Sequence, residues 1–76
     1  MSGAKIDKLV RMANQIGDYF TAMPEAEAVA GAADHLRAYW TPKMVGEIIA
    51  YADSGHAGLN AVAARAVAEL KRRSFV

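Results

Sequence analysis

Apolar side chains recur along this chain at the three- and four-residue spacing of an amphipathic helix. In the first segment the repeat runs from Ile6 to Phe20, with charged and amide side chains between the apolar positions. A second apolar stripe follows Pro24. Its members are Val29, Ala32, Ala33, Leu36, Tyr39 and Trp40. Because the same spacing continues to residue 70 and no stretch alternates with the period of a strand, the sequence predicts an all-α fold.

Residues that favour helix ends divide the chain into four segments. Pro24 suits the first turn of a new helix, and Thr41 followed by Pro42 combines a capping side chain with a proline at the first helical position. Gly55 can terminate a helix in the left-handed conformation, and Asn60 can cap the helix that follows. These boundaries predict helices over residues 5–22, 24–40, 42–54 and 60–73.

The composition predicts a single small domain with a thin core. Of 76 residues, 54% are hydrophobic, but 17 of these are alanine, which leaves 24 larger apolar side chains. Chains below roughly 80 residues usually need a disulfide, a metal or a partner chain to become stable. The sequence has no cysteine, so disulfides and thiolate metal sites are excluded. We therefore expect residues 1–76 to form one compact bundle of four short amphipathic helices that binds a partner chain or self-associates when isolated.

The charge distribution argues against a nucleic-acid surface on the folded body. The net charge is +1, but Lys71, Arg72 and Arg73 supply three of the nine basic residues, so residues 1–70 carry −2. A slightly acidic body is not typical of a phosphate-binding surface. No stretch approaches the roughly 18 to 20 apolar residues of a membrane span, and no hydrophobic signal-peptide core follows the N-terminus. We expect a cytoplasmic protein that binds neither membrane nor nucleic acid.

Catalytic motifs are missing from the sequence. It contains no cysteine nucleophile, no HExxH zinc motif and no glycine-rich phosphate loop. His35 follows Asp34 directly, and adjacent positions on a helix diverge by about 100°, so the pair does not form a site by itself. His56 lies in a glycine-containing loop, where exposure to solvent is the simpler interpretation. The sequence therefore offers no catalytic, cofactor-binding or metal-binding residue.

A partner-binding surface is a more promising hypothesis. Trp40 and Met44 lie on either side of the corner at Thr41 and Pro42, and tryptophan, methionine and arginine are enriched at protein interfaces. Trp40 could equally fill a small core, and the polar face of the first helix could simply be solvated. The predicted partner-binding residues are Arg11, Asn14, Gln15, Arg37, Trp40, Pro42, Lys43 and Met44.

Two segments together resemble a known family. They are Leu9–Ile16, with the sequence LVRMANQI, and Ala32–Met44, with the sequence AADHLRAYWTPKM. In their order and spacing they resemble the delta subunit of soluble NAD-dependent formate dehydrogenase. The resemblance implies a small helical accessory subunit that binds the catalytic subunit of a molybdenum- or tungsten-dependent complex. It also implies that the pterin, Fe–S, FMN and NAD cofactors belong to partner subunits.

The sequence analysis thus predicts a non-catalytic accessory subunit that stabilises or helps assemble formate dehydrogenase. A second hypothesis is a small helical regulator that binds nucleic acid through the basic C-terminal residues 71–73. A third is a stand-alone enzyme, for which only Asp34, His35 and His56 are available.

Overall fold

The computed structural model describes residues 2–74 of the chain and the side chains of residues 5–73. Within this range the regular elements are all helices, which confirms the predicted all-α fold. They are α1 (Ser2–Phe20), α2 (Glu25–Tyr39), α3 (Pro42–Asp53) and α4 (Ala61–Ser74). The last three agree with the predicted ranges to within one residue at each end. None of the described helices is long and apolar enough to cross a membrane.

The first helix starts at residue 2 rather than 5 and ends at residue 20 rather than 22. Its early end has a local cause. The chain turns at residues 21–23, where Met23 N–H donates to the carbonyl of Phe20 at 3.0 Å. A residue that precedes proline disfavours the helical conformation, so α1 closes before Pro24.

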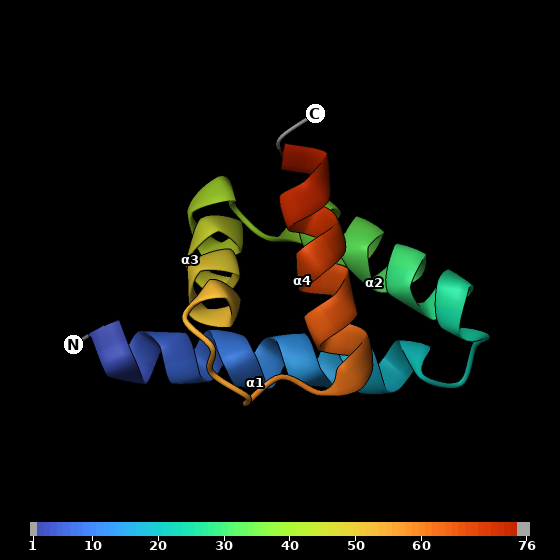
Figure 1. Cartoon of the computed structure of the whole chain (residues 1–76), viewed down its shortest axis with the longest axis horizontal. Coiled ribbons are helices and arrows are strands. Elements are labelled where there is room, and N and C mark those ends of the chain that lie inside the picture. Colours follow the sequence, from blue (N-terminus) through green and yellow to red (C-terminus); the bar gives the residue numbers. More distant parts are fainter. Residues whose placement is uncertain (1, 75–76) are drawn as a thin grey trace.

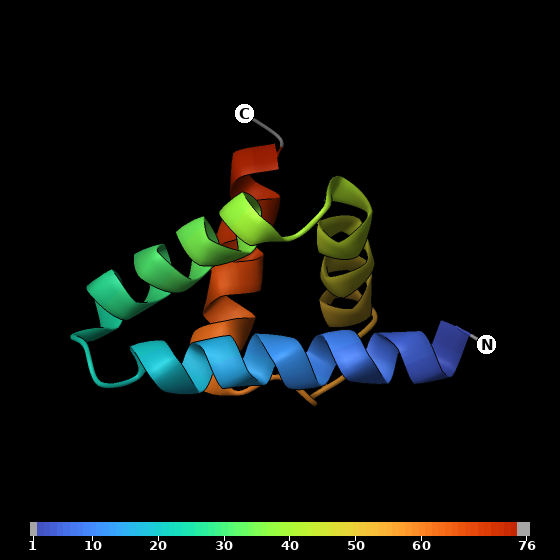
Figure 2. The ribbon, with the colours of Figure 1, turned by 180° about the vertical axis from the view of Figure 1, so that it is seen from behind.

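Figure 1 shows α1 along one edge of the molecule, with α3 and α4 standing across it. Helix α2 crosses obliquely behind α4, and the reverse view in Figure 2 places α2 in front. Helix α4 packs against each of the other three helices, most extensively against α2. The first and the last helix of the described chain, α1 and α4, thus pack steeply across each other.

Helix ends follow the capping chemistry that the sequence indicates. Thr41 Oγ1 accepts a hydrogen bond from Met44 N–H at 3.2 Å at the start of α3. Asn60 Oδ1 does the same for Ala63 N–H at 2.9 Å at the start of α4. Gly55 adopts the expected left-handed conformation, with φ of 85°. The two side-chain hydrogen bonds satisfy backbone N–H groups that the start of a helix leaves unpaired. The left-handed Gly55 lets the chain change direction after α3.

The core is built around small side chains where α2 crosses α4. Ala32 and Ala33 of α2 and Ala63 and Ala66 of α4 are at most 1% exposed. Larger apolar side chains complete this core, namely Leu9, Leu36, Trp40, Ile48, Val67 and Leu70. Alanine brings helix backbones close together but contributes little apolar area, so the burial available for stability is limited.

The expectation that Tyr39 continues the inward stripe of α2 is wrong, because this side chain is 75% exposed. At about 100° per residue, position 39 lies about 60° around the helix from Leu36. It also lies only about 20° around the helix from the buried Ala32, so its exposure reflects its place as the last residue of α2 rather than a different face of the helix.

A hydrogen-bonded junction joins α1 to the start of α4. Asn14 Nδ2 donates to the carbonyl of Gly58 at 2.8 Å, and Asn60 N–H donates to Asn14 Oδ1 at 2.8 Å. Asn60 Nδ2 donates to the carbonyl of Asn14 at 3.0 Å and to Asp18 Oδ1 at 3.1 Å. Gly17 makes room for this junction, because a Cβ there would lie 2.4 Å from Asn60 Oδ1.

We expect Gly17→Ala to lower the free energy of unfolding by about 1 to 3 kcal/mol, the usual range for overpacking. The new methyl group would also lie 3.0 Å from the backbone nitrogen of Ala63, which cannot move freely. Gly46→Ala is the control, since a Cβ at this position meets nothing within 4 Å. It should raise the free energy of unfolding by about 0.5 to 1 kcal/mol. Urea unfolding followed by circular dichroism measures the free energy of unfolding of both variants. If Gly17→Ala stabilised the protein as much as Gly46→Ala, α1 and α4 would not be in close contact at Gly17.

We expect Asn60→Ala to lower the free energy of unfolding by about 2 to 3 kcal/mol. The substitution removes a helix cap and also the side-chain hydrogen bonds to α1. Thr41→Ala is the matched control, because it removes a cap bond alone and should lower the same quantity by about 1 kcal/mol. Equal effects in urea unfolding would mean that the junction adds nothing beyond the cap.

Candidate partner-binding site

Residues of α1, α2 and α3 and of the segments that follow α1 and α2 line a groove of about 810 Å³, to which α4 contributes no lining residue. The lining residues are Met12, Gln15, Ile16, Tyr19, Phe20, Met23, His35, Tyr39, Trp40 and Met44. They include three of the four methionines and four of the six aromatic residues of the chain. The lining contains one histidine, His35, and no lysine, arginine or carboxylate. We call this surface the methionine–aromatic groove.

Exposed apolar side chains concentrate at this groove. Among the described residues, three large hydrophobic side chains are exposed: Tyr19 at 73%, Tyr39 at 75% and Met23 at 42%. All three line the groove. Scattered exposed apolar residues are normal, but contiguous ones mark interaction surfaces, and tyrosine and methionine are enriched there. The groove therefore has the character of a protein-binding surface.

Ring contacts hold the wall of the groove in place. Tyr19 and Phe20 meet edge to face at 5.0 Å between centroids, and Phe20 lies 6.3 Å from His35. His35 in turn lies 4.6 Å from Tyr39. These contacts link the end of α1 to α2, and packed aromatic rings lose little conformational entropy when a partner binds. Phe20 also packs against α2 at Gly31, where a Cβ would lie 2.6 Å from the ring.

Trp40 combines the two roles that the sequence left open, packing in the core and lining a candidate binding surface. It is 7% exposed and part of the core cluster, so it is a structural residue. Its remaining surface lines the methionine–aromatic groove and also a smaller hollow of about 350 Å³ beside Arg37 and Pro42. A partner could therefore contact Trp40 only at its edge.

The structure separates the predicted partner-binding residues into groups. Gln15, Trp40 and Met44 line the methionine–aromatic groove, whereas Arg37 and Pro42 lie beside the smaller hollow. Arg11 and Lys43 are exposed but line neither. The side chain of Asn14 is occupied by the junction with Gly58 and Asn60.

Sequence reasoning missed the most exposed members of the groove, Tyr19, Met23 and Tyr39. A signal was present in the first helix. Met12, Ile16 and Tyr19 follow a helical spacing beside the core stripe, so the apolar face is wider than contact with one neighbour requires.

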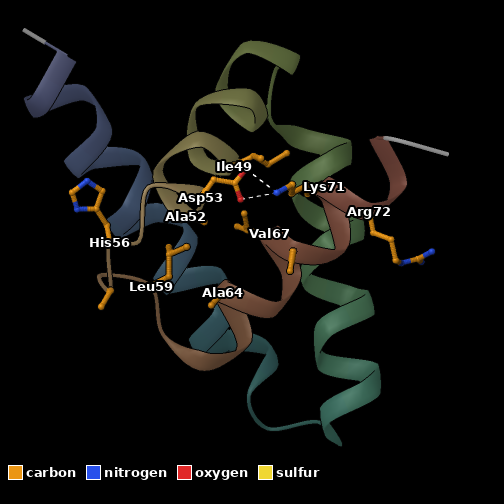
Figure 3. A pocket seen from close by; sticks show the side chains of 11 residues that line it. Ile49, Ala52, Asp53, His56, Leu59, Ala64, Val67, Lys71 and Arg72 are labelled. Atoms are coloured by element: carbon orange, nitrogen blue, oxygen red, sulfur yellow. Dashed lines mark hydrogen bonds and ion pairs between the residues drawn. The ribbon is translucent and has the colours of Figure 1, made fainter.

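A second hollow, of about 610 Å³, lies between the end of α3, the following loop and α4 (Figure 3). Its charged groups are already partnered or directed elsewhere. Lys71 Nζ lies 2.9 Å from Asp53, and Arg72 points away from the hollow. The ring of His56 stacks on Tyr51 at 4.7 Å. These interactions stay within the chain and leave the hollow without a free charged group for a ligand.

The basic residues near the C-terminus are also paired with carboxylates. Arg73 donates to Asp34 at 2.9 Å and to Glu69 at 3.0 Å, and Arg72 Nε donates to Glu69 at 3.0 Å. Hydrogen bonds from Arg72 and then Arg73 lower the pKa of Glu69 to about 2. The carboxylate therefore remains charged at neutral pH, and the basic segment carries little uncompensated charge for phosphate binding.

Titratable residues form no evident reaction centre in the part of the chain that the structure describes. Asp34 bonds to Arg73, while its neighbour His35 contacts aromatic rings. No group of three or more histidine, aspartate or glutamate side chains within the described range could hold a metal ion.

No curated protein and no solved structure matches the chain. A sequence profile of the family described as NADH-dependent formate dehydrogenase delta subunit FdsD matches residues 8–67. The match spans α2 and α3 entirely and most of α1, and it includes every residue that lines the methionine–aromatic groove. Since it covers well over half of the sequence, the chain belongs to the formate dehydrogenase delta subunit family.

Proposed function

We propose that this chain is a non-catalytic accessory subunit that binds the catalytic subunit of a cytoplasmic, NAD-linked formate dehydrogenase and stabilises it or assists its assembly. The observation that carries the proposal is the methionine–aromatic groove, where Tyr19, Met23 and Tyr39 are exposed together. Membership of a formate dehydrogenase subunit family supports a role within a larger complex.

The chemistry of formate oxidation is assigned to the partner subunits in this proposal. Fe–S clusters need cysteine ligands, and this sequence has none. The molybdenum or tungsten pterin, the Fe–S clusters, FMN and NAD would all be held by larger chains. The delta subunit would act on them only by stabilising the fold that holds them.

Binding of this kind stabilises the catalytic subunit by an amount that depends on the affinity and the concentration of this chain. A ligand that binds only the folded form of the catalytic subunit, at about 100 times its Kd, adds about 2.7 kcal/mol to the stability of that subunit. Such a gain is large beside the 5 to 15 kcal/mol of a typical folded domain.

We expect the complex made without this chain to contain less cofactor-loaded catalytic subunit and to inactivate at a lower temperature. The turnover of each loaded catalytic site should stay the same. The measurement is thermal inactivation together with activity normalised to bound molybdenum or tungsten.

His35→Ala and His56→Ala extend this test to the two histidines of the chain. Neither should change kcat per loaded site, because His35 contacts rings and His56 stacks on Tyr51. A large fall in kcat at unchanged subunit content and cofactor loading would contradict a non-catalytic role.

A further inference from the structure

The length of the methionine–aromatic groove limits the kind of segment that it can hold. Its α1 wall runs from Met12 to Phe20, nine residues that span about 12 Å along the helix. Helix α2 contributes His35 and Tyr39, one turn apart, with His35 beside Phe20 of α1. About two turns of a helix, with two or three apolar side chains on one face, match this length.

The walls of the groove also constrain the backbone of the bound segment. The lining is formed mainly by side chains of α1, α2 and α3, whose main-chain groups are largely engaged in helical hydrogen bonds. The groove has no strand edge with which an extended peptide could pair. A segment that satisfies its own backbone hydrogen bonds is therefore favoured, and a helix does so.

One end of the groove is positively charged. Lys5 of α1 and Glu47 of α3 face each other, with Nζ and Oε1 3.8 Å apart. Lys8 lies one turn after Lys5, and Lys43 lies one turn before Glu47. Three lysines and one glutamate thus give this end a formal charge of +2.

The two extra lysines are next to the groove. Lys8 precedes the lining residue Met12 by one turn, and Lys43 is adjacent to Met44. Neither lysine forms an ion pair within the described part of the chain, whereas all four basic residues of α4 do. A carboxylate on the bound segment would form an ion pair with either lysine.

We propose that the methionine–aromatic groove binds a short amphipathic helix of the catalytic subunit, with apolar side chains in the groove and carboxylates against Lys8 and Lys43. This inference rests on the proposed function. A second copy of the chain is a poorer match, because five of its eight carboxylates are already in ion pairs.

The first experiment compares variants in the purified complex by measuring dissociation of this subunit. Tyr39→Ala should accelerate dissociation at least tenfold, because it removes an aromatic anchor. The side chain is 75% exposed, so helicity and the melting temperature of the free subunit should be unchanged. His56→Ala, on the loop beside the second hollow, is the control and should have no effect.

Charge reversals test the acidic character of the bound helix. Lys8→Glu and Lys43→Glu should each accelerate dissociation several-fold at low salt and less at 1 M salt, where the Debye length is about 3 Å. Arg37→Glu is the matched control, because it makes the same change in charge at the smaller hollow. An equal effect of all three reversals, or no effect of either lysine reversal, would overturn the acidic assignment.

A photo-crosslinking amino acid, benzoylphenylalanine, in place of Tyr39 identifies the bound segment directly. The expected product joins the catalytic subunit through a helical peptide with Asp or Glu beside apolar residues. Crosslinking to a second copy, or to a segment without carboxylates, would overturn the proposal. If the unmodified subunit fails to co-purify with the catalytic subunit, the proposed function itself is wrong. Normal assembly of the Tyr39 and lysine variants would instead refute only the assignment of the groove.

Discussion

The approach of α4 to α1 at Gly17 is the constraint on which the arrangement of the helices depends. Asn60 caps α4 and at the same time bonds to the backbone of Asn14, so one side chain fixes where α4 starts and how it meets α1. A side chain at position 17 would fill the space that Asn60 occupies. This junction orients α4 so that its alanine face can cross α2, and that crossing buries most of the core.

Placing α4 on one side of the other three helices leaves their opposite side uncovered. Trp40 fills the space between the two sides, buried against the core and open at its edge to the methionine–aromatic groove. A chain with 24 large apolar side chains cannot cover both faces and also bury an interior. The exposed Tyr19 and Tyr39 are the consequence, and the same shortage of core explains why a partner chain would benefit this subunit.

The α4 side and the groove side of the molecule differ in whether their basic residues are paired with carboxylates. The basic residues of α4 form ion pairs with carboxylates of α2, α3 or α4 itself, which joins helices and neutralises that surface. Surface pairs of this kind contribute little stability individually, so their main effect is on the field around the molecule. The uncompensated lysines Lys8 and Lys43 remain beside the groove.

Local patterns in the sequence determined the four helices, because Thr41, Gly55 and Asn60 act on neighbouring backbone groups through short-range chemistry. The family was also readable, since it depends on the order of residues alone. Only the tertiary structure decided that Tyr39 faces solvent and that Tyr19 and Met23 join it in one groove. Periodicity tells which residues share a face of one helix. Which of several apolar faces is covered depends on contacts between helices distant in sequence, such as α2 with α4.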